Sequence, residues 1–89
     1  MADQDKIING TFDYRKIEKA ARIMPMITIY EHPDDYPDKY VARVWDANEP
    51  THLITLADTL DEIRKTIPQN MVLIQKCRTD EPCIVELWI

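Results

Sequence analysis

The scarcity of glycine and serine is the feature that most limits how this chain can fold. It has a single glycine, Gly10, and no serine, against six prolines. Two-residue hairpin turns need positive φ, which glycine supplies most readily, so turns built from Pro, Asn and Asp favour connections of about three to five residues. The same two absences exclude a serine nucleophile and a glycine-rich phosphate-binding loop.

The length of 89 residues indicates one domain with a small core. A chain of this size buries only about two-thirds of its unfolded surface, and a second copy often adds stability, so we expect a homodimer. No apolar run approaches the roughly 20 residues that span a membrane. The acidic start of the chain, Ala2–Asp5, does not resemble a signal peptide. We therefore expect a cytoplasmic protein with reduced cysteines.

A helix is predicted over residues 11–24. Thr11 or Asp13 can cap its start, and Pro25 ends it. Its apolar side chains recur at the helical spacing. They are Tyr14, Ile17, Ala21 and Met24.

Three strands are predicted after Pro25, over residues 26–31, 39–45 and 52–57, because β-branched residues and alternation replace the helical spacing. In the second strand the alternation separates two sets of side chains. Tyr40, Ala42 and Val44 form one face, and Val41, Arg43 and Trp45 form the other.

A second helix is predicted over residues 58–67, and its start is well marked. Asp58 or Thr59 can cap it, and Thr59 with Glu62 fits a capping box. Pro68 ends it.

Residues 71–77 and 83–89 are predicted to form a hairpin that completes the order helix, then β-β-β-α-β-β. This order predicts a two-layer α+β fold in which an antiparallel sheet is packed by one or two helices. Because a complete unit begins at residue 26, we divide the chain into an N-terminal helical extension, residues 1–25, and a small α+β module, residues 26–89.

The two cysteines, Cys77 and Cys83, flank the turn of this hairpin. One register places them opposite each other, close enough for a disulfide, whereas a slip of one residue places Cys77 beside Ile84. A redox pair would usually take the Cys-x-x-Cys spacing at a helix start. We therefore expect buried thiols.

The segment EHPDDYPDKY, residues 31–40, gathers four carboxylates, a histidine and two tyrosines. As a metal site it would use His32 with the aspartates, and His52 from the third strand. It has neither the HxH nor the HxxxH spacing, and it lacks the glycine of a calcium loop. We predict no metal site here.

Two other interpretations of this segment stay open. As a strand connection, its two prolines fix φ while Asp34 and Asp35 form turns. As a contact loop, it offers Tyr36 and Tyr40 as aromatic surface and its acids as charge. We favour the connecting loop, with partner contact as the alternative role.

Charge is unevenly placed along the chain. Residues 1–25 carry five bases against four acids, and residues 26–89 carry six against twelve, leaving +1 and −6. A surface of −6 repels phosphate backbones, so nucleic-acid binding by the main body is disfavoured and a protein with a basic surface is the natural partner. The alternative is a nucleic-acid-binding regulator whose N-terminal helix makes the contact. That helix carries Lys16, Lys19 and Arg22.

The stretch KYVARVW, followed by a strand and then by ADTLDEI, resembles the small antitoxin domain of the HicB type. That family has two or three strands and then a helix entered through a DTLEEA-like capping sequence. The resemblance covers residues 26–67 and rests on the strand spacing and the capping residues Asp58, Thr59, Leu60 and Glu62. The Gly-Cys pair that typically precedes this helix is missing. The layout YPDKYVARVW, DTLDEI and EPCIVELWI is also similar to short uncharacterised proteins of bacterial mobile elements. Both resemblances imply a binding module and supply no catalytic residue.

Together these features predict a non-enzymatic, acidic protein-protein interaction module. Nothing in the spacing brings a cysteine together with His32 or His52, so no catalytic, cofactor-binding or metal-binding residue is assigned. An antitoxin-like or inhibitor protein of a bacterial mobile element fits, with the carboxylates of residues 31–38 and of the turn at residues 58–62 occupying a basic groove. The candidate partner-binding residues are Asp34, Asp35, Tyr36, Asp38, Tyr40, Trp45 and Trp88.

Overall fold

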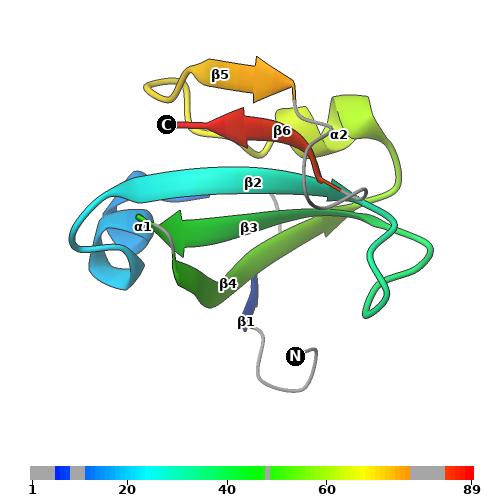
Figure 1. Ribbon diagram of the computed structural model, residues 1–89, viewed down its shortest axis with the longest axis horizontal. Coiled ribbons are helices and arrows are strands. Elements are labelled where there is room, and N and C mark those ends of the chain that lie inside the picture. Colours follow the sequence, from blue (N-terminus) through cyan, green and yellow to red (C-terminus); the bar gives the residue numbers. More distant parts are fainter. Residues whose placement is uncertain (1–5, 9–11, 48, 77–83) are drawn as a thin grey trace.

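The computed structural model describes residues 6–8, 12–47, 49–76 and 84–89, and within them one sheet dominates the structure (Figure 1). Its elements in chain order are β1 (Lys6–Ile8), α1 (Tyr14–Ala20), β2 (Pro25–Glu31), β3 (Tyr40–Asp46), β4 (Glu49–Ala57), α2 (Leu60–Arg64), β5 (Leu73–Lys76) and β6 (Ile84–Trp88).

The described strands form a six-stranded sheet in the order β1-β4-β3-β2-β6-β5. β2, β3 and β4 are antiparallel neighbours, and β6 pairs with the free side of β2. β5 follows as an antiparallel edge strand. At the other edge, β1 runs parallel to β4 with Lys6 opposite Leu53. The sheet is therefore mixed.

The predicted fold class, a helix-first α+β fold with an antiparallel sheet packed by helices, is wrong. A strand, β1, precedes the first helix, and its parallel pairing makes the sheet mixed. The two helices in the described residues span only 7 and 5 residues. Three-residue β1 is too short to show alternation, and its partner lies far along the chain, as the hydrogen bond from the Thr55 hydroxyl to the Ile8 carbonyl illustrates (2.7 Å).

The central strands and the final hairpin were predicted correctly. β2 and β3 lie close to the predicted ranges, and β4 begins earlier than predicted, at Glu49. β5 and β6 pair antiparallel, with Leu73 opposite Trp88. The two alternative registers of Cys77 and Cys83, and the buried thiols that we expect, lie outside the described residues.

α1 is shorter than the predicted helix over residues 11–24. Asp13 is its N-cap, with Oδ1 accepting from the Arg15 amide at 3.0 Å. The helix ends at Ala20, and the amides of Ile23 and Met24 donate instead to Asp46 Oδ1 at 3.0 and 2.8 Å. A proline also disfavours helical geometry in the residue before it, so the chain becomes extended ahead of Pro25.

α2 starts as predicted but ends early. The Thr59 Oγ1 accepts from the Glu62 amide at 3.1 Å, which confirms the predicted N-cap. After Arg64 the chain continues in tight turns, with the Thr66 and Ile67 amides donating three residues back. Such i→i+3 bonds commonly close a short helix.

The core lies on the face of the sheet that both helices contact. Ile17 of α1 and Ile63 of α2 are fully buried there. The sheet contributes Ile27, Ile29, Ala42, Val44 and Leu53 to the same cluster. Ala42 and Val44, with Tyr40 packed beside them, confirm the predicted face of the second strand.

Residues before Pro25 also belong to this core. Phe12 is 4% exposed and its amide donates to the Thr66 carbonyl at 2.9 Å, and Ala21 is 2% exposed. Packing therefore crosses the division that we placed between residues 25 and 26. Independent folding of residues 26–89 is untested.

Candidate functional site

The segment between β2 and β3 is a compact connecting loop. Its ends are joined by a hydrogen bond from the His32 amide to the Lys39 carbonyl (3.0 Å), and the Tyr36 amide donates to the Pro33 carbonyl (2.9 Å). His32 has a φ of 49°, unusual for a residue other than glycine. Pro33 is buried. The predicted strand connection is confirmed.

This loop and the start of α2 come together at one end of the sheet. The register places Tyr40 opposite both Glu31 and Ala57, so the end of β4 and its following helix adjoin the loop. Lys39 Nζ forms an ion pair with Asp58 that joins the two segments. These two segments carry exposed carboxylates, of which Asp38 and Glu62 act on Lys39 together with Asp58. We call them the acidic end: Glu31, Asp34, Asp35, Asp38, Asp58, Asp61 and Glu62.

The field of the acidic end acts on two of its own side chains. The pKa of Lys39 is raised by its hydrogen bond to Asp58 and by the charges of Asp58, Asp38 and Glu62. The pKa of Tyr40 is raised because its hydroxyl donates to Glu31 Oε2 (2.9 Å). Since one lysine is held by several acids, this end keeps an excess of negative charge.

A second feature, on the face opposite the helices, centres on Arg43. The β3–β4 register shifts between Arg43 and Trp45, which leaves a bulge in β4 around Thr51. The Arg43 Nη1 donates to the Thr51 carbonyl at 2.7 Å, and its Nη2 lies 3.9 Å from Asp35 Oδ2. The Arg43 side chain is only 12% exposed. Bulges often re-aim side chains near functional sites.

Aromatic side chains line the pocket around Arg43. The Trp45 Nε1 donates to the Tyr30 hydroxyl at 3.0 Å, which fixes the indole beside the guanidinium. Pro33 from the loop and His52 from β4 complete the walls of a pocket of about 350 Å³. We call it the Arg43 pocket. It can take up a flat or apolar group next to a fixed positive charge.

In Figure 1, α1 lies at the opposite end of the sheet from the connection between β2 and β3. Basic side chains of α1 and its neighbours line two hollows there. Lys6 of β1 and Lys16 and Lys19 of α1 line a hollow of about 460 Å³ against the start of β4. Arg15 of α1 and Arg22, just after the helix, line a neighbouring hollow in which Glu18 is an acidic neighbour. We call the hollow with Lys6, Lys16 and Lys19 the basic groove.

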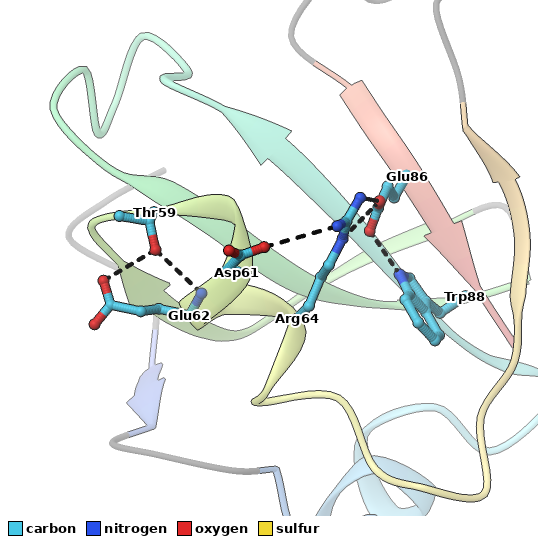
Figure 2. Close-up of polar contacts among 6 residues, drawn as sticks. All are labelled: Thr59, Asp61, Glu62, Arg64, Glu86 and Trp88. Carbon is cyan, nitrogen blue, oxygen red and sulfur yellow. Dashed lines mark hydrogen bonds and ion pairs between the residues drawn. The ribbon is translucent and has the colours of Figure 1, made fainter.

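One buried carboxylate lies apart from these features. Glu86 of β6 is 1% exposed, and Figure 2 shows Arg64 of α2 and the Trp88 indole directed at it. The Arg64 Nε donates to Oε2 at 2.9 Å, and the Trp88 Nε1 donates to Oε1 at 3.1 Å. The contact with Glu86 raises the pKa of Arg64. Both carboxylate oxygens are paired, and we interpret the cluster as an anchor of α2 on β6.

The predicted partner-binding residues fall into separate places. Asp34 and Asp38 are exposed at the acidic end, where Tyr36 is half-buried in the same loop. Asp35 and Trp45 line the Arg43 pocket. The structure thus brings Asp35 and Trp45 together from two segments that the sequence treated independently.

The remaining two predicted residues take part in intramolecular contacts. Tyr40 packs on the core and places its ring edge-on to His32, with centroids 5.2 Å apart. Trp88 packs on the same core and donates to Glu86.

Sequence reasoning missed Tyr30, Arg43 and His52 as pocket residues. The alternation in β3 already placed Arg43 beside Trp45 on one face, and this was a usable signal. Pro50 was a second signal, because proline occurs in strands mainly at edges and bulges. The position of His52 depends on the register shift itself, for which the sequence gives no sign.

No family model matches the chain, and neither a curated protein nor a solved structure shows significant similarity to it. The resemblance to HicB-type domains and mobile-element proteins therefore stays a prediction. Among the described residues, no three His, Cys, Asp or Glu side chains come together as a metal site. In the same part of the chain, no helix is long and apolar enough to cross a membrane.

Proposed function

We propose that this chain is a non-enzymatic binding module whose acidic end docks on a basic surface of another protein. The observation that carries the proposal is the meeting of two acidic segments, residues 31–38 and 58–62, at one end of the sheet. The Lys39–Asp58 ion pair joins them. An antitoxin-like or inhibitory role, in which these carboxylates fill a nucleic-acid groove of the target, agrees with this arrangement. We expect the protein to act in the cytoplasm.

Exposed charges act on binding mainly through long-range steering of the encounter. The carboxylates of the acidic end are exposed on two adjacent segments, so a partner meets them as one charged surface. Tyr36, half-buried in the loop, adds aromatic surface of the kind that anchors interfaces.

The experiment compares capture of partners by three versions of the full chain. The acidic-end variant carries Asp34→Asn, Asp38→Asn and Glu62→Gln, which spares Asp35 and its contact with Arg43. The matched control carries Lys16→Gln and Lys19→Gln in the basic groove. A protein with a basic surface should be retained by the wild type and by the control, and lost by the acidic-end variant. Equal retention by all three would contradict the proposal.

A second copy of the chain is the other proposed partner. Val72, just before β5, and Ile89, just after β6, pair through two backbone hydrogen bonds. Both side chains are exposed, as is that of Ile74 in β5 (53% exposed). Apolar side chains grouped at an edge favour burial in an interface. The bulge between Leu73 and Gln75 favours side-chain packing over extension of the sheet. Sedimentation at micromolar concentration should give a dimer that Ile74→Lys dissociates, and a wild-type monomer would contradict this.

A second function, nucleic-acid binding by the N-terminal helix, is supported by the separation of charge. Lys16 and Lys19 lie on α1 and Arg22 follows it, and Figure 1 places α1 at the opposite end of the sheet from the β2–β3 connection that carries residues 31–38. Local charge, rather than the net charge of −5, governs contact with phosphates at such a surface.

A further inference from the structure

The Arg43 pocket adjoins the acidic end through the loop between β2 and β3. Pro33 and Asp35 belong to this loop, and both line the pocket. Asp35 is also one of the carboxylates of the acidic end, and its Oδ2 lies 3.9 Å from Arg43 Nη2. Asp34 is exposed beside it in the same loop. A protein that docks on the carboxylates of this loop therefore also lies next to the pocket.

The pocket has flat, preorganised walls. The Trp45 Nε1 donates to the Tyr30 hydroxyl at 3.0 Å, and the Arg43 Nη1 donates to the Thr51 carbonyl at 2.7 Å. These bonds hold an indole and a guanidinium in place before a partner binds. The volume of about 350 Å³ lies at the low end of the range for binding pockets, about 300–1,000 Å³. The pocket therefore has room for a single side chain.

Charge favours an aromatic side chain over a basic one inside the pocket. The Arg43 side chain lines the wall and is only 12% exposed, so a lysine or arginine placed there would meet a like charge that is weakly screened. An aromatic ring responds in the opposite way, because a guanidinium is attracted to the face of a ring. The indole and phenol walls also pack well against a ring. Basic groups of a partner belong outside the pocket, beside Asp34 and Asp38, which are exposed.

We propose that the Arg43 pocket is the anchor site for the partner of the acidic end, and that it takes up one aromatic side chain flanked by basic residues. The inference rests on the proposed binding function and names the chemistry of the partner: a basic surface from which a phenylalanine, tyrosine or tryptophan projects. A side chain of this kind, buried in a pocket, carries a large share of the binding energy in many interfaces. The carboxylates then set the rate of encounter, and the pocket sets the lifetime of the complex.

Three short peptides test the inference on the full chain at low salt. They are KKFKK, KKAKK and EEFEE, each acetylated at its start and amidated at its end, and NMR titration measures the affinity of each. KKFKK should bind at least about fivefold more tightly than KKAKK, because the ring adds stacking and buried area. EEFEE should bind more weakly than KKFKK, because the acidic end repels its charges.

The two tryptophans of the chain locate the contact. KKFKK should shift the indole N–H signal of Trp45, and KKAKK should leave it in place. Trp88 is the internal control, because its indole donates to Glu86 Oε1 at 3.1 Å and its signal should not shift. This measurement uses the wild-type chain, so it tests the inference even where a pocket variant fails to fold.

Two variants separate the pocket from the charges. Trp45→Ala should remove the advantage of KKFKK over KKAKK and leave the affinity for KKAKK unchanged. Asp34→Asn with Asp38→Asn should weaken both basic peptides by a similar factor and keep the advantage of KKFKK. Circular dichroism checks that each variant retains the sheet.

Two results would overturn the inference, and they differ in what else fails. If KKFKK and KKAKK bind equally and the aspartate variant weakens both, the acidic end attracts basic partners but the pocket is not an anchor. If neither basic peptide binds at millimolar concentration, or if EEFEE binds best, the acidic end attracts no basic partner and the proposed function is wrong as well.

Discussion

At the scale of single residues, the pairing of Arg64 with Glu86 compensates the cost of burying a carboxylate. A carboxylate that is 1% exposed carries a large desolvation cost unless both its oxygens are hydrogen-bonded. Arg64 and the Trp88 indole meet that requirement from α2 and from β6 itself. The Arg64 side chain is 35% exposed, so water shares in its solvation. Removal of the Arg64 side chain should therefore lower the free energy of unfolding more than its exposure suggests, because Glu86 is then left without its cation.

A double-mutant cycle tests this pairing. Arg64→Met should lower the free energy of unfolding by about 3 kcal/mol, because it leaves a buried charge unpaired. Adding Glu86→Gln should recover about half of that loss, since the neutral amide needs no cation and can still accept from Trp88. Urea denaturation measures both values. Additive losses in the double variant would contradict the pairing.

The Tyr40–Glu31 hydrogen bond gives stability a dependence on alkaline pH. Because donation to Glu31 raises the pKa of Tyr40 above its ordinary value of 10.0, the folded state holds the phenol proton more strongly than the unfolded state. The contribution of this hydrogen bond to the free energy of unfolding is therefore complete below about pH 10. It is lost as the pH rises through the raised pKa of Tyr40 in the folded state. Absorbance at tyrosinate wavelengths, with Tyr40→Phe subtracted, should show that Glu31→Gln lowers this pKa. An unchanged titration would contradict the contact.

At the scale of elements, α1 is a short helix held mainly by one side chain. Ile17 is its one buried residue, at 0% exposure. A seven-residue helix is marginal alone, so packing must supply its stability. Docking of α1 also brings Lys16 and Lys19 toward β1 and β4, where they line the basic groove.

Substitution of Ile17 tests whether α1 is docked. Ile17→Ala should lower the free energy of unfolding by about 3 kcal/mol through lost burial and a residual cavity. Ile23→Ala is the matched control, because Ile23 is 82% exposed and its loss should cost less than about 0.5 kcal/mol. Thermal or urea unfolding compares the two. Equal, small losses would indicate that α1 is not part of the core.

Features that depend on residues close together in the sequence could be predicted from the sequence. The Thr59 cap, the strands β2 and β3, the two faces of β3 and the β5–β6 pairing follow from side-chain period and capping chemistry. The parallel pairing of β1 and the bulge that forms the Arg43 pocket depend on contacts between distant segments. The acidic end was predictable as two segments, 31–38 and 58–62, but their meeting depends on the β3–β4 register.

At the scale of the whole molecule, the core includes residues on both sides of Pro25. The sequence pattern alone predicts that residues 26–89 keep their sheet and unfold cooperatively. The burial of Phe12, Ile17 and Ala21 leads us to expect the opposite.

Removal of residues 1–25 tests this expectation. The truncated chain loses β1 and α1, which exposes the apolar face around Ile27 and Val44. We expect a poorly cooperative or unfolded chain by circular dichroism and urea titration, because a domain this small has little stability to lose. A sharp unfolding transition with a retained sheet signal would restore the boundary at residue 26.

At the scale of the whole molecule, the acidic end and the basic groove are formed by different elements, and the central claim is that the acidic end steers a basic partner. The most direct measurement is the association rate constant with the partner isolated by capture, as a function of ionic strength. For the wild type it should fall steeply with salt. Asp34→Asn, Asp38→Asn and Glu62→Gln together should slow association severalfold at low salt and flatten that slope, while the free energy of unfolding changes by less than about 1 kcal/mol. A rate constant and salt slope equal to those of the wild type would contradict the claim.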